Sequence, residues 1–127
     1  MRTRNVVALV ACGVLLGFAA RGAAQRRSEA LNRSQLLIPQ FRNASVDVWK
    51  TVLGPHEKIG MHRHDHGRVV VALKGGTLTI PHDDGGSHQL VLETGKAYWL
   101  DADPPGKRHG DTNDSDRPIE MMVIEMR

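Results

Sequence analysis

The clearest secondary-structure pattern in the chain runs through MHRHDHGRVVVALKGGTLTI, residues 61–80. Val69–Leu73 is a continuous apolar run of strand length, and Thr77–Ile80 alternates between polar and apolar residues, as a half-buried strand does. Gly75 and Gly76 lie between the two runs and would allow a tight turn with positive φ. The stretch therefore predicts a β-hairpin.

Short runs of strand character also occupy the rest of the chain beyond residue 35. They are separated by turn residues such as Asp83–Gly86 and by a polar loop over Asp101–Asp116. The further predicted strands are Leu36–Ile38, which stops at Pro39, then Ser45–Leu53, Gln89–Leu92, Ala97–Leu100 and Ile119–Met126. We favour a strand for the last run because Pro118 precedes it. Roughly seven or eight such strands predict an all-β sandwich or barrel over residues 36–127.

The first 24 residues have the pattern of a secretory signal peptide. Arg2 and Arg4 precede the apolar run Val6–Ala20, and small residues offer a cleavage site near Ala24. We therefore expect a periplasmic or secreted protein with a flexible leader over residues 25–35. The alternative is a retained membrane anchor, for which the run is short.

Charge and cysteine content exclude some classes of partner and of catalysis. Three of the 17 basic residues lie in the predicted signal peptide, which leaves 14 basic against 14 acidic residues in the mature chain. This balance indicates neither a nucleic acid nor an anionic membrane surface as a partner. Cys12 is the only cysteine and would leave with the signal peptide, so disulfides and thiol catalysis are excluded for the mature protein.

The histidines of residues 62–66 carry the main chemical signal. His62, His64 and His66 stand at alternate positions, so on an extended segment their side chains would point to one face. Imidazole is the commonest protein ligand of transition metals, and His109 follows from a distant part of the chain. His66 would be an additional ligand on a regular strand. Alternatively, Gly67 breaks the strand and leaves His66 at the solvent rim.

These residues resemble the two signature motifs of the cupins. The matching positions are His62, His64 and Gly75 in the first motif and Gly95, Pro104, Gly106, His109 and Asn113 in the second. The resemblance covers about Val46 to Met126. It implies a double-stranded β-helix, or jelly-roll barrel, with a divalent metal held in its mouth by His62, His64 and His109.

The chain departs from the cupin pattern at the fourth ligand. Where the family has a glutamate, this chain has Arg68 and Val69, and a guanidinium does not ligate metals. In one interpretation the three histidines bind Fe, Mn, Ni, Cu or Zn and support a dioxygenase acting on a small organic molecule, with Arg68 pairing an anionic substrate. In the other, the barrel is a metal-free or metal-sensing module that binds a sugar or metabolite without catalysis.

Two further expectations concern the pocket and assembly. One of Tyr98 and Trp99 should face inward by strand alternation, to line the pocket or to fill the core. Apolar Leu36–Ile38 and Met121–Met126 offer edge strands through which two copies could form a homodimer.

Overall fold

The computed structural model describes residues 20–27 and 36–127. The chain divides into two units, Met1–Leu31 and Asn32–Arg127, and the functional residues lie in the second. Residues 20–27 are helical. Most of the predicted signal peptide and leader falls outside the described residues, so both stay predictions. Among the described residues, no helix has the length and apolar character needed to cross a membrane.

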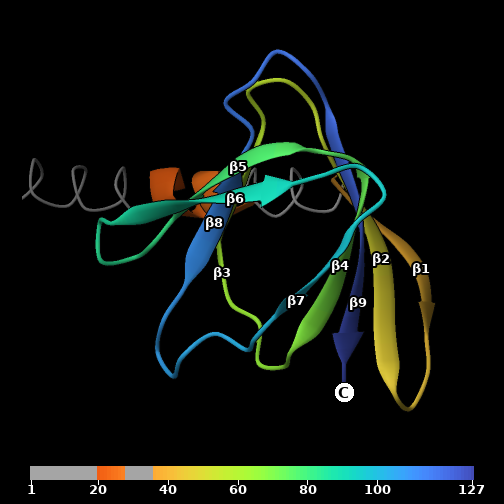
Figure 1. Ribbon diagram of the computed structural model, residues 1–127. Helices are drawn as coiled ribbons and strands as arrows, with labels where there is room; N and C mark the ends of the chain where they lie inside the picture. Colours follow the sequence, from red (N-terminus) through yellow and green to blue (C-terminus); the bar gives the residue numbers. More distant parts are fainter. Residues whose placement is uncertain (1–19, 28–35) are drawn as a thin grey trace, which may run out of the picture. The chain divides into compact units, whose positions relative to one another are not determined.

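In the described part of the second unit, residues 36–127, the chain forms nine strands, labelled in Figure 1. They are β1 (Leu37–Arg42), β2 (Val46–Leu53), β3 (Lys58–His62), β4 (Arg68–Lys74), β5 (Gly76–Pro81), β6 (Ser87–Leu92), β7 (Ala97–Leu100), β8 (His109–Thr112) and β9 (Ile119–Met126). The prediction of an all-β fold is confirmed, and the last apolar run is a strand as expected.

The strands form two antiparallel sheets. One has the order β1-β2-β9-β4-β7 and the other β3-β8-β5-β6, so that neighbours in each sheet often lie far apart in the sequence. This two-sheet arrangement is the double-stranded β-helix that the sequence resemblance implied. It brings β3 and β8, which carry two of the histidines, side by side.

The core lies between the two sheets and follows from the period-two pattern of the strands. In β9, Ile119, Met121 and Val123 are buried while the residues between them are partly exposed. Leu53 and Leu78 add fully buried side chains from β2 and β5. Burying each aliphatic side chain of this size contributes roughly 1.5–3 kcal/mol to folding.

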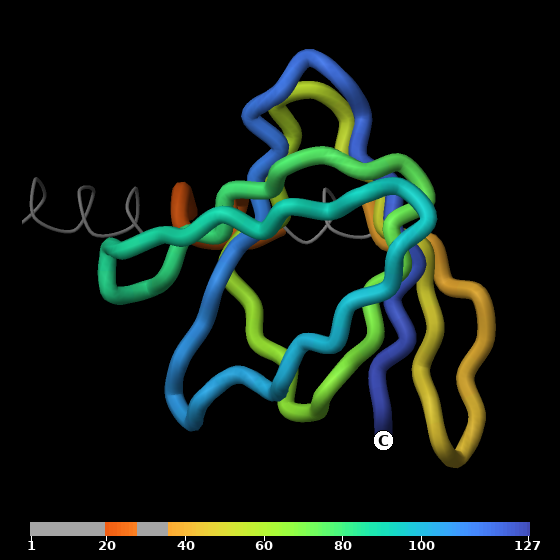
Figure 2. The backbone as a smooth tube through the Cα atoms, viewed as in Figure 1, coloured from red at the N-terminus to blue at the C-terminus, as the bar shows by residue number. Residues whose placement is uncertain are grey.

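The predicted hairpin at Gly75 and Gly76 is wrong. β4 pairs with β7 and β9, whereas β5 pairs with β6 and β8. The chain therefore crosses from one sheet to the other at this point, and its path can be followed in the backbone trace of Figure 2. Neither glycine has positive φ. Gly75 is required instead because a Cβ there would lie 2.2 Å from the carbonyl oxygen of Leu92. Gly106, a position of the second motif, does have positive φ, at 74°.

Three smaller predictions also need correction. The first strand continues through Pro39 to Arg42, with an irregular register after Pro39, and β1 is an edge strand, where the missing N–H of proline is tolerated. The loop predicted over Asp101–Asp116 contains β8. Finally, β9 pairs on both sides with β2 and β4, so Met121–Met126 has no open edge for a homodimer, whereas β1 has one.

Candidate metal centre

Three imidazoles converge between the sheets. His62 is the last residue of β3 and pairs across the ladder with His109, the first residue of β8. His64 lies two residues beyond the end of β3 in a loop. The side-chain nitrogens that these three residues could offer to a metal all lie within 4.8 Å of one another. The structure therefore brings together the three histidines named by the sequence motifs.

The way in which these histidines are presented differs from the expectation. The predicted extended segment with three imidazoles on one face ends at His62, because residues 63–67 form a loop. Two hydrogen bonds to Asp103 hold that loop in place. The backbone N–H of His64 donates to Asp103 Oδ2 at 2.6 Å, and the backbone N–H of Asp103 donates to the His64 carbonyl at 2.9 Å. The ring of Trp49 lies parallel to that of His64, 6.2 Å between centroids.

Each imidazole has a hydrogen-bond acceptor or carboxylate at its Nδ1 atom. His62 Nδ1 contacts the Gly60 carbonyl at 2.9 Å, His64 Nδ1 hydrogen bonds to Glu125, and His109 Nδ1 lies 3.0 Å from Asp103 Oδ1. Such partners orient metal-binding histidines and leave Nε2 as the nitrogen through which a metal is bound. The arrangement fits a divalent transition metal bound by three imidazoles.

The charge state of the centre also suits a metal. Burial, with the nearby positive charge of Arg68, lowers the pKa of His64 to about 3. Burial raises the pKa of its partner Glu125. Both shifts disfavour a His64–Glu125 ion pair, so His64 is neutral at neutral pH and contacts Glu125 as a neutral imidazole. Metal coordination requires neutral imidazole.

Asp103 keeps its negative charge beside the centre. Burial by itself would raise its pKa, but the hydrogen bond from the backbone N–H of His64 and the electrostatic effects of His109 and Arg68 outweigh this effect. The net pKa of Asp103 is therefore lowered. A charged Asp103 strengthens the electron donation of His109 toward a metal.

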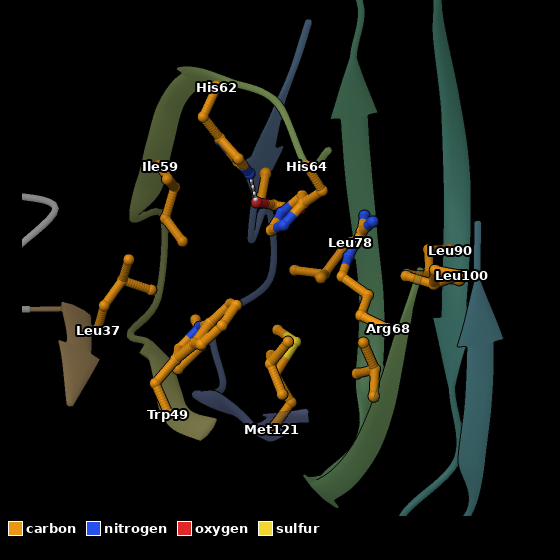
Figure 3. Close-up of a pocket in the computed structure, with 14 residues that line it drawn as sticks. Leu37, Trp49, Ile59, His62, His64, Arg68, Leu78, Leu90, Leu100 and Met121 are labelled. Atoms are coloured by element: carbon orange, nitrogen blue, oxygen red, sulfur yellow. Dashed lines mark ion pairs between the residues drawn. The ribbon is translucent and has the colours of Figure 1, made fainter. Parts of the chain in front are cut away.

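A small cavity of about 50 Å³ adjoins the histidines, and Figure 3 shows His62, His64 and Arg68 around it. Its polar side includes these residues, Thr51 and Asp111, and its wall is otherwise apolar. The apolar lining consists of Leu37, Trp49, Ile59, Val70, Leu78, Leu90, Leu100, Met121 and Val123. At about 15 Å³ per water site, the cavity accommodates roughly three water-sized groups. It is therefore suited to a ligand with few heavy atoms.

Arg68 faces this cavity from β4 and is only 7% exposed. Its Nη1 donates to the Asp101 carbonyl at 3.1 Å, and burial lowers its pKa from the usual value, although arginine remains charged in proteins. Arg68 thus points into the cavity, as it would have to in order to pair with an anionic substrate.

The other predicted site residues lie away from the cavity. His66 is exposed in the loop after β3. The Tyr98 hydroxyl accepts the backbone N–H of Glu93 at 2.8 Å, and Trp99 is 57% exposed and covers Gly67. Neither aromatic residue lines the cavity, whereas Trp49 of β2 does.

Three carboxylates of the centre were missed by sequence reasoning. Glu125 belongs to the last strand and reaches His64 only because β9 is central in its sheet. Asp103 and Asp111 were hidden in a loop rich in aspartate. Asp111 could have been found by strand alternation from His109, had β8 been recognised.

The comparisons with known proteins agree with this fold and motif set. No protein-family model matches the chain. The chain is similar to a cupin domain from Bordetella pertussis, with a TM-score of 0.63 and 30% identity over 72% of this chain and 93% of that one. An RmlC-like cupin with a double-stranded β-helix fold from Methanocaldococcus jannaschii gives a TM-score of 0.56 at 16% identity, over 71% of this chain and 77% of that one, and so shows the fold alone. This chain belongs to the cupin superfamily.

A curated relative is also similar in sequence. The beta-alanine degradation protein BauB of Pseudomonas aeruginosa is 34% identical over 88 residues, which cover 69% of this chain and 88% of that protein.

Proposed function

We propose that this cupin binds one divalent transition metal through His62, His64 and His109. The observation that carries the proposal is the common geometry of the three imidazoles, each oriented by an oxygen at Nδ1. The ion would be Fe, Mn, Ni, Cu or Zn, the metals for which imidazole is a good ligand. The depressed pKa of His64 supports binding at neutral pH, since no proton then competes with the metal.

We further propose oxidoreductase activity of the dioxygenase type on a small organic molecule. A redox-active divalent metal would supply the electron-transfer chemistry that such a reaction needs. The chain itself would bind and orient the substrate. Arg68 offers a buried cation to an anionic group, and the apolar cavity wall excludes water and limits substrate size. The link of BauB to degradation of beta-alanine supports a small catabolic substrate.

We also propose export to the periplasm or cell exterior. Support comes from the two arginines before the apolar run Val6–Ala20 and from the small residues near Ala24. Expression of the full chain followed by N-terminal sequencing of the product tests this point. Cleavage near Ala24 is expected, and an intact Met1 on a product that remains inside the cell would contradict it.

Metal analysis tests the central proposal. The protein purified without chelator is expected to contain close to one transition metal per chain, and the His62→Ala and His109→Ala variants are expected to contain little. A parent protein that takes up no metal after loading would overturn the proposal. Oxygen consumption by the iron-loaded protein with catechols, diketones and thiols tests the catalytic part, which uniform inactivity would contradict.

A further inference from the structure

Asp111 approaches the histidine cluster from a different side than the other two carboxylates. Glu125 and Asp103 contact Nδ1 atoms, which is the side of the ring away from a bound metal. Asp111 Oδ2 instead lies 3.5 Å from Nε2 of His62, the atom through which that ring would bind a metal. Figure 3 marks this contact with the dashed line at His62.

The fold places Asp111 on this inner side by strand alternation. It stands two residues after His109 on β8, so both side chains leave the same face of the strand. Asp111 pairs across the ladder with Ile59, and both line the cavity together with His62. Its side chain is only 19% exposed. The carboxylate is therefore directed into the site and not into solvent.

The distance between Asp111 and His62 fits two ligands of one ion. With metal–ligand bonds of about 2.1 Å, neighbouring ligand atoms are separated by roughly 3.0 Å in an octahedral site and about 3.4 Å in a tetrahedral one. The observed 3.5 Å is close to these values and longer than a normal hydrogen bond between nitrogen and oxygen. The separation is thus compatible with two atoms that bind the same ion.

We propose that Asp111 is the fourth ligand of the metal, which makes the site three histidines and one aspartate. The inference rests on the proposed metal binding by His62, His64 and His109. It means that β8 supplies the carboxylate absent from the end of the first motif, where Arg68 stands. An octahedral ion would then keep two positions for water or substrate, and the carboxylate would add an oxygen donor of the kind that suits Mn and Fe(II).

The position of Arg68 is consistent with this ligand set. Its charge acts on Asp103, Asp111 and Glu125, so the guanidinium lies among all three carboxylates of the centre. Arg68 and a divalent ion would both place positive charge beside these carboxylates. Burial of so many charges is tolerated when they are paired in this way. Arg68 therefore takes over charge balance, while Asp111 takes over ligation.

The test compares the parent protein with Asp111→Asn, Asp111→Ala and Asp65→Asn. Asp65 is a matched control because it is an aspartate of the same region with a side chain 69% exposed. Each protein is prepared without metal and then titrated with Co(II) and Zn(II). The measurements are the melting temperature with and without metal, the affinity by competition with a chromophoric chelator, and the visible absorption of bound Co(II).

If Asp111 is a ligand, both Asp111 variants lose at least about tenfold in affinity. Their metal-induced rise in melting temperature shrinks and the Co(II) bands change, while Asp65→Asn matches the parent. Parent-like affinity and Co(II) bands in the Asp111 variants would overturn the inference and leave three-histidine binding intact. A change confined to the metal-free melting temperature would also overturn it, because it would show a purely structural role. Failure of the proposed function is distinguished by the parent itself, which would bind neither ion.

Discussion

Asp103 lies on the Nδ1 side of His109, with its Oδ1 atom 3.0 Å from the imidazole Nδ1. Its other oxygen accepts the backbone N–H of His64 at 2.6 Å. A single carboxylate thus orients one candidate ligand on β8 and holds the loop that presents another. This double role couples the two halves of the metal centre, although Asp103 is not itself expected to touch the metal.

Asp103→Asn is expected to weaken metal binding by roughly 10- to 100-fold, because partners behind metal-binding histidines contribute on this scale. Chelator competition measures the effect. Asp116→Asn is the control, since that side chain is 95% exposed and pairs with His56 at the surface. Equal affinities for the two variants would contradict the role assigned to Asp103.

Arg68→Lys is expected to weaken binding of small carboxylates such as formate and acetate to the metal-loaded protein. Lysine keeps the positive charge among the three carboxylates but loses the planar two-point contact of guanidinium. Thermal shift as a function of ligand concentration measures the effect. Lys107→Arg, at an exposed loop position, serves as a control for surface charge. Unchanged carboxylate binding in Arg68→Lys would remove Arg68 from ligand recognition.

Gly75→Ala is expected to destabilise the fold by about 3 kcal/mol or more, as severe steric conflicts in a packed backbone do. The new Cβ would lie 2.2 Å from the Leu92 carbonyl oxygen and 2.7 Å from the Thr94 nitrogen, both backbone atoms. Urea unfolding measures the loss. Gly60→Ala is the matched control because nothing lies within 4 Å of its added Cβ. A Gly75→Ala protein as stable as Gly60→Ala would refute the close sheet crossing.

Asn113→Ala is expected to cost about 3 kcal/mol of folding free energy, because it removes three hydrogen bonds made by a fully buried amide, one of them to the buried carbonyl of Leu53. Asn113 is fully buried, and its Nδ2 donates to the carbonyls of Leu53, Gly54 and Arg117. Asn43→Ala is a suitable comparison, since Asn43 stabilises an exposed turn by accepting two backbone N–H groups. Urea denaturation of both variants should show the larger loss at Asn113, and the reverse order would contradict the structure.

The period-two pattern and turn residues predicted most of the strands, because side-chain alternation and backbone preference are local properties. They placed Val69–Leu73 and Thr77–Ile80 in strands correctly, yet assigned them to one hairpin. The short β8 was missed because Gly110 and Asp111 lack strand character. Which strands pair depends on packing across the whole chain, and local pattern does not report it.

The same division applies to the metal centre. Sequence alone determined the cupin motifs, the candidate ligands His62, His64 and His109, and the replacement of the usual glutamate by Arg68. Only the tertiary structure decided that Glu125 and Asp103 contact the Nδ1 atoms of the imidazoles, whereas Asp111 lies near an Nε2 atom. The reason is that β9 and β8 reach the histidines through sheet pairing between distant segments. Packing, and not spacing along the chain, then decides whether a carboxylate contacts the Nδ1 or the Nε2 atom of a ring.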